Sequence, residues 1–141
     1  MAATDQHTTN YTDTFIAVAE DTKAVEGQAP PTKDVPTVAQ LHYELLAEHP
    51  YTLTSDDLLF AVHARRQAIA DEDREAERHR FFSEGQPCLR SSPLGKTYGW
   101  GTHHDADGKV AFYAMDSPEY ERLSNDPNLR HVKAMRAARA K

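Results

Sequence analysis

The stretch "KTYGWGTHHDADGKVAFYAM", Lys96–Met115, decides the fold because it predicts a β-hairpin. The turn is "DADG", in which Gly108 can adopt the positive φ that tight hairpin turns require. On the strand that follows, side chains alternate between two faces, with Val110, Phe112 and Ala114 on one and Ala111, Tyr113 and Met115 on the other. The chain therefore contains an antiparallel sheet, and the remaining elements must pack around it.

Strand and helix patterns flank this hairpin. Upstream, the sequence predicts a strand at 14–19, a proline-rich surface loop at 20–36, and helices at 37–49, 54–69 and 71–84. Downstream, it predicts a short helix that begins at Ser117 and a basic helix over 127–141. The expected order is β-α-α-α-β-β-α-α. This order indicates an α+β fold with a small, mainly antiparallel sheet of about three strands and helices packed against it.

Length and composition indicate one compact unit. The 141 residues predict a loose N-terminal tail at 1–12, a single α+β domain at 13–126 and the basic C-terminal helix at 127–141. The net charge of −6 disfavours nucleic acid as a partner, although the last fifteen residues hold five cations and no acid. No apolar run is long enough to span a membrane, and residues 1–13 lack the features of a signal peptide, so the sequence predicts a cytoplasmic protein.

The chain has one cysteine, Cys88, and its surroundings exclude several familiar chemistries. A phosphatase loop needs arginine where Leu94 stands, and a redox or zinc-deaminase motif needs cysteine where Ser91 stands. The single thiol excludes internal disulfides and multi-cysteine metal sites. Cys88 is then either a small buried apolar residue or a nucleophile activated by Arg90, two positions further on.

Histidines and arginines give the other candidate site residues. His103 and His104 are adjacent on a strand and must point to opposite faces, so no shared metal site is expected. His63 and Arg66 lie on the second helix near its apolar stripe, where they either face a pocket or pair with nearby acids. The alternation in "YGWG" leaves one face bare for a packed helix or a ligand, with Tyr98 and Trp100 on the other face.

These residues support three hypotheses about function. The first is a module that binds a small anionic or carboxylate-bearing ligand, held by Arg66 and Arg90 with Tyr98 or Trp100 packed on its apolar part. The second is a small enzyme with Cys88 as nucleophile, or with His63, His103 or His104 as general acid or base. The third is an interaction protein that acts through the basic C-terminal helix. No metal or other cofactor is predicted, and association with a second copy of the chain is compatible with the sequence.

Several long segments of the sequence also resemble those of a known protein family. The segments "NYTDTFIAVAED", "TSDDLLFAVHARR", "FFSEGQPCLRSSPLGKTYGWGTHHDADGKVAFYAM" and "SPEYERL" together resemble a bacterial family whose domain has no known function. The resemblance extends over roughly 10–123, most of the chain. It implies no activity, cofactor or catalytic residue, so the chemistry must come from the side chains themselves.

Overall fold

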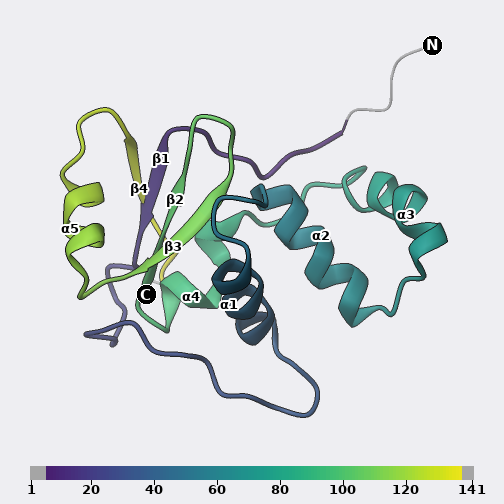
Figure 1. The fold of residues 1–141 in the computed structure, drawn as a ribbon, viewed down its shortest axis with the longest axis horizontal. Coiled ribbons are helices and arrows are strands. Elements are labelled where there is room, and N and C mark those ends of the chain that lie inside the picture. Colours follow the sequence, from purple (N-terminus) through teal and green to yellow (C-terminus); the bar gives the residue numbers. More distant parts are fainter. Residues whose placement is uncertain (1–5, 138–141) are drawn as a thin grey trace.

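The computed structural model describes residues 6–137 and contains one open sheet with helices on both of its faces (Figure 1). The sheet has four strands in the order β3-β2-β1-β4. They are β1 (Thr14–Ala17), β2 (Trp100–His104), β3 (Val110–Ala114) and β4 (Arg130–Lys133). The α+β class is confirmed, and most of the expected element order is found.

The hairpin that decides the fold is confirmed. Strands β2 and β3 pair antiparallel, with His104 opposite Val110 and Trp100 opposite Ala114. In the turn, the Gly108 N–H donates to the Asp105 carbonyl at 3.0 Å, and Gly108 has a φ of 78°. A residue with a Cβ would be strained in that conformation, which explains the glycine.

Strand β1 lies between β2 and β4. It pairs antiparallel with β2, with Phe15 opposite His103, and parallel with β4, with Ile16 opposite Val132. Phe15 and Ile16 are almost fully buried on opposite faces of the sheet. The N-terminal strand is therefore joined to segments from the other end of the chain.

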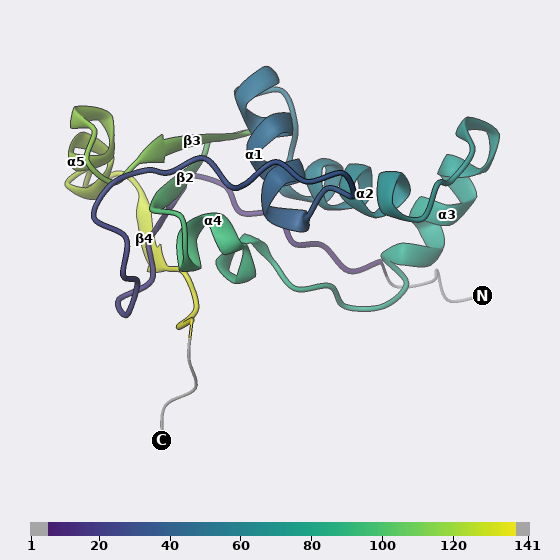
Figure 2. The same cartoon turned by 90° about the horizontal axis from the view of Figure 1, so that it is seen from below.

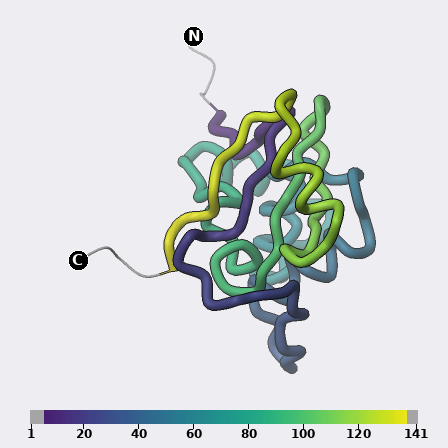
Figure 3. The backbone as a smooth tube through the Cα atoms, turned by 90° about the vertical axis from the view of Figure 1, so that its left-hand side faces the viewer, coloured from purple at the N-terminus to yellow at the C-terminus, as the bar shows by residue number. Residues whose placement is uncertain are grey.

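The expected C-terminal helix is wrong over the described part of 127–141. Residues 130–133 form β4, which runs beside β1 in Figure 3. The Arg130 N–H donates to the Asp13 carbonyl and the Ala134 N–H to the Ala17 carbonyl, both at 2.8 Å. Strand β1 is buried, so the backbone N–H and carbonyl groups on the edge that does not face β2 need hydrogen-bond partners. This requirement outweighs the weak helical periodicity of the apolar residues in the segment. Residues 138–141 lie outside the described residues.

The helices begin at local signals that the sequence displays. Helix α1 (Val38–Glu48) is capped by Thr37, and α5 (Pro118–Ser124) is capped by Ser117 with proline in its first turn. Helix α2 (Ser55–Arg66) has a capping box formed by Thr54 and Asp57. The charged segment forms a short 3₁₀ turn, Asp71–Asp73, and then α3 (Arg74–Phe81). A 3₁₀ turn at Leu89–Ser91 and helix α4 (Pro93–Lys96) were not expected, since each is too short to show a period.

Two apolar clusters hold these elements. The larger one joins one face of the sheet to α1, α2 and α4, and includes Ile16, Leu46, Leu58, Leu94 and Val110. The smaller one joins α2 to α3 around Phe60, Ala64 and Phe82. Helix α5 covers the other face of the sheet, and α3 lies at the opposite end of the molecule (Figure 2). No helix in residues 6–137 has both the length and the apolar character needed to cross a bilayer.

The prediction of a loose N-terminal tail is wrong for residues 6–12. Thr9 is buried, and its N–H and hydroxyl both donate to Oδ1 of Asp56 at 2.7 Å. The His7 N–H donates to the Phe82 carbonyl at 2.8 Å. The carboxylate in the first turn of α2 therefore fixes a segment whose polar composition suggested a free end, while residues 1–5 lie outside the described part of the chain.

The packing of α5 against the sheet can be tested at Gly101, which lies beside the rings of Tyr120 and Phe15. A Cβ at this position would lie 2.6 Å from Cε2 of Tyr120 and 2.7 Å from Cζ of Phe15. We expect Gly101→Ala to lower the free energy of unfolding by about 1–3 kcal/mol, measured by urea denaturation, because the rings must move apart. Gly85→Ala is the control, since its Cβ would meet only His7 Nδ1 at 3.8 Å. An equal loss of stability in both variants would contradict this account of the contact.

Candidate functional site

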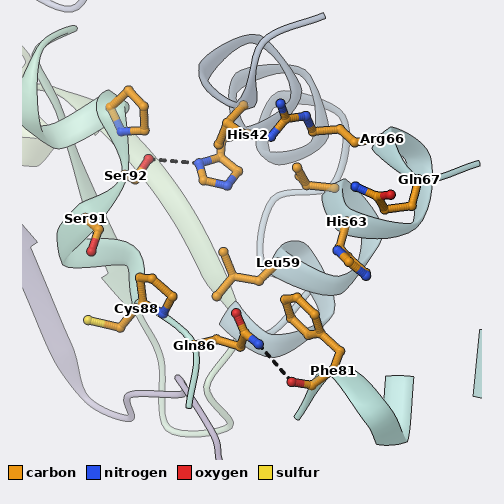
Figure 4. Close-up of a pocket in the computed structure, with 14 residues that line it drawn as sticks. His42, Leu59, His63, Arg66, Gln67, Phe81, Gln86, Cys88, Ser91 and Ser92 are labelled. Carbon is orange, nitrogen blue, oxygen red and sulfur yellow. Dashed lines mark hydrogen bonds between the residues drawn. The ribbon is translucent and has the colours of Figure 1, made fainter. Parts of the chain in front are cut away.

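A pocket of about 380 Å³ lies between helices α1 and α2, the segment 86–93 and the end of α3 (Figure 4). Its walls are mainly apolar. The lining residues are Val38, His42, Leu59, Val62, His63, Arg66, Gln67, Phe81, Gln86, Pro87, Cys88, Ser91, Ser92 and Pro93. A volume of this size lies in the range of small-molecule sites.

His42 is the most deeply placed polar group in this wall. It is 3% exposed, and its Nδ1 lies 2.9 Å from Oγ of Ser92. Its Nε2 is buried and has no hydrogen-bond partner within the described residues. Burial lowers the pKa of His42 to about 4, so the imidazole is neutral near pH 7. The pocket therefore contains an unused polar atom on an uncharged ring.

Arg66, in contrast to His42, is exposed to solvent. It belongs to the last turn of α2, and no carboxylate in residues 6–137 forms an ion pair with it. Two of the nearby acids form ion pairs with other arginines, since Asp57 pairs with Arg78 at 3.0 Å and Asp71 with Arg74 at 3.5 Å. The guanidinium of Arg66 is thus available at the edge of the pocket.

His63 and Gln86 complete the polar part of the wall. The His63 ring lies against Phe81, with centroids 4.5 Å apart and planes tilted by 31°. The side-chain amide of Gln86 donates to the Phe81 carbonyl at 2.8 Å. Both contacts hold Phe81 against the cavity and connect the smaller apolar cluster to it.

Cys88 lines the pocket, but its sulfur is directed elsewhere. Its Sγ lies 3.3 Å from the hydroxyl of Tyr11, and Figure 4 shows it pointing away from His42 and His63. Burial, followed by the contact with Cys88, raises the pKa of Tyr11. The partner of the thiol is therefore a phenol, whereas a nucleophilic cysteine is usually activated by a neighbouring base such as histidine.

The other expected ligand-binding residues do not reach this pocket. The Arg90 Nε donates to the Lys133 carbonyl at 2.7 Å, and its own carbonyl accepts from the Met135 N–H, so Arg90 fastens the segment after β4. Trp100 packs against Tyr43 and Phe112 and donates its ring N–H to the Gln28 carbonyl at 2.9 Å. Tyr98 lines a separate cavity beside the start of α1.

His103 and His104 point to opposite faces of the sheet, as their adjacency on a strand predicted. His103 Nδ1 lies 2.7 Å from the hydroxyl of Tyr51, which is also 2.8 Å from the hydroxyl of Tyr113. His104 is fully buried beside Tyr11, and its Nε2 lies 3.1 Å from the hydroxyl of Thr102. Burial lowers the pKa of His104 to about 4, with a smaller contribution from His103. Neither histidine lines the pocket.

The structure thus brings together three of the expected residues, His63, Arg66 and Cys88, and adds His42 and Ser92, which the sequence reasoning missed. The signals for both were present. His42 follows Val38 by four positions and precedes Leu46 by four, so it lies on the buried stripe of α1. Ser92 precedes proline just as Ser117 does, and it caps α4 in the same way.

Comparison with known proteins agrees with the resemblance seen in the sequence. Residues 6–140 match the family described as "Family of unknown function (DUF6157)", and the chain belongs to that family. No curated protein and no solved structure gives a significant match to the chain. The function of the family is unknown, so the function of this chain must be argued from the pocket.

The buried histidines make stability depend on pH. The unfolded chain protonates them near the ordinary pKa of 6.5, whereas folded His42 and His104 are protonated only near 4. Between these two pH values the unfolded state binds more protons than the folded state, so protonation favours unfolding. The stability associated with the two neutral, buried histidines is therefore complete above pH 6.5 and is lost as the pH falls towards 4. We expect the free energy of unfolding to fall over this range by about 3 kcal/mol for each histidine, measured by urea titrations at several pH values.

His42→Phe should reduce this pH dependence by roughly half, because one of the two groups no longer titrates. Leu46→Ala is the matched control, since it removes a buried side chain of the same helix and no titrating group. A wild-type pH dependence in His42→Phe, or a reduced one in Leu46→Ala, would contradict the assignment.

Proposed function

We propose that the protein binds a small carboxylate-bearing molecule in the pocket between α1 and α2. The apolar body of the ligand lies among Leu59, Val62 and Phe81, and its carboxylate pairs with Arg66. The supporting observation is the guanidinium of Arg66, which has no acidic partner in the described residues and lies at the edge of a cavity with mainly apolar walls and no acidic lining residue. Arginine matches a carboxylate in charge and in the geometry of its paired donors.

Two further features of the pocket support a neutral, apolar body for this ligand. His42 is uncharged near neutral pH, so it offers a hydrogen bond without adding a positive charge. No acidic residue is among the lining residues, and the groups that surround Leu59, Val62 and Phe81 include no carboxylate that would repel the ligand. A site of this kind disfavours cations and strongly hydrated dianions, because their desolvation is not compensated.

The alternative of a cysteine enzyme receives less support from the same geometry. The Cys88 sulfur lies 3.3 Å from the Tyr11 hydroxyl, and the pocket histidines form their contacts with Ser92 and Phe81. A thiol whose hydrogen-bond partner is a phenol and not a histidine lacks the usual general base for its activation. Cytoplasmic location, and the expectation that nucleic acid is not a partner, remain predictions from the sequence.

The test compares two arginines of one helix. The probes are 4-acetylbenzoate and 4-isopropylbenzoate, each with its neutral primary amide, and binding is measured by titration calorimetry or ligand-observed NMR. We expect the wild type to prefer the acids, and Arg66→Ala to weaken acid binding by roughly 10-fold, since a charge-assisted hydrogen bond is lost. Arg65→Ala is the control, because neighbouring Arg65 is also exposed but does not line the pocket.

Equal affinity for acids and amides in the wild type would overturn the proposal. So would an equal loss of affinity in Arg65→Ala and Arg66→Ala, because the effect would then come from the general charge of the helix end. Failure of both benzoates to bind the wild type would also overturn it for this class of ligand.

A further inference from the structure

We infer that the ligand carries, besides its carboxylate, a neutral hydrogen-bond acceptor such as a carbonyl oxygen, which receives the Nε2–H of His42 at the buried end of the pocket. This inference rests on the proposed function and narrows the ligand class to carboxylic acids that also carry a neutral oxygen acceptor, of which a carbonyl is the simplest example. It follows from the tautomer of His42, from the burial of its free nitrogen and from the different depths of His42 and Arg66.

The tautomer is determined by Ser92. The Leu94 N–H donates to Oγ of Ser92 at 3.2 Å, in the cap of α4, so this oxygen acts as an acceptor there. The hydroxyl proton of Ser92 has one remaining partner in the described residues, which is His42 Nδ1 at 2.9 Å. If Ser92 donates this proton, Nδ1 is the acceptor and the ring proton lies on Nε2.

The other tautomer leaves more buried polar groups without partners. With the proton on Nδ1, the ring donates to Ser92, and both the Ser92 hydroxyl proton and the bare Nε2 lack a partner. Ser92 is 4% exposed and His42 is 3% exposed, so water does not readily replace these bonds. Buried polar groups are normally paired, and each unpaired one is destabilising. The arrangement with the proton on Nε2 leaves one unsatisfied group, and that group is a donor.

An N–H donor in the wall requires an acceptor from the ligand. Nε2 is the buried polar side-chain atom of this pocket that has no partner among the described residues. A carbonyl, ether or hydroxyl oxygen can accept its proton, whereas an ammonium or amide N–H cannot. A second carboxylate is disfavoured at this depth because His42 is neutral and supplies no compensating charge.

The depths of the two polar groups define the order of groups along the ligand. Arg66 is exposed at the edge, and His42 is buried within the wall, while Leu59 and Val62 lie among the lining residues of the same cavity. The ligand therefore has its carboxylate towards solvent, a carbon skeleton against the aliphatic wall and its neutral oxygen at the inner end. Figure 4 shows the imidazole of His42 directed into the space above Leu59.

The experiment compares 4-acetylbenzoate with 4-isopropylbenzoate, which are similar in size, a methyl group of the second standing where the first has its carbonyl oxygen. We expect the wild type to bind the acetyl compound about 10-fold more tightly, because a site built around a hydrogen bond rejects an analogue that lacks it. His42→Phe, which keeps an aromatic ring and removes the donor, should abolish this preference. Arg66→Ala should weaken both compounds by the same factor and leave the preference intact.

Each outcome decides between the two proposals. If both benzoates bind the wild type equally and depend on Arg66, the inference is overturned and the proposed function stands. If neither binds, both are overturned. Nitrogen-15 NMR of the wild-type imidazole gives an independent reading that needs no variant: a proton on Nε2 of His42 is expected, and a proton on Nδ1 would overturn the inference even if His42→Phe failed to fold.

Discussion

The pairing of β1 with two distant strands is the constraint on which the rest of the structure depends. Residues 14–17 join β2 on one side and β4 on the other, so the two ends of the described chain meet within the sheet. Phe15 points to the face that α5 covers, where its ring meets Tyr120, and Ile16 points into the larger cluster beneath α1 and α4. One short buried strand therefore positions both helical layers, because its alternating side chains are needed on both faces.

The pocket follows from the way the two apolar clusters divide the molecule. The larger cluster packs α1 and α4 against the sheet, and the smaller one joins α2 to α3. Helix α2 contributes to both, with Leu58 in the larger and Phe60 in the smaller, so the two halves meet along this helix. The cavity lies at this meeting, with Leu59 and Phe81 on one side and the segment 86–93 on the other. The hydrogen bond between Ser92 and His42 fastens that segment to α1.

The chemistry of the pocket depends on a contrast between its two main polar groups. His42 is buried and uncharged near neutral pH, which in the proposed function suits it to a neutral hydrogen-bond acceptor. Arg66 is exposed, and in the proposed function its guanidinium pairs with a carboxylate in a position partly screened by solvent. Ser92 serves the cap of α4 and the orientation of His42 together, so the fold and the proposed site share one side chain.

Local signals were enough to predict the hairpin, the places where three helices begin, at residues 37, 54 and 117, and the α+β class, because a turn glycine or a capping hydroxyl acts on neighbours within a few residues. Strand β4 was mistaken for a helix because its conformation comes from β1, more than a hundred residues earlier in the chain. The same limit applies to the site: sequence placed His63, Arg66 and Cys88 among the candidates, but the side chains they meet come from distant segments. Tertiary contacts alone decided that Arg90 holds β4, that Cys88 faces Tyr11 and that His42 faces the pocket, because which atoms meet is set by packing between elements rather than by spacing along one of them.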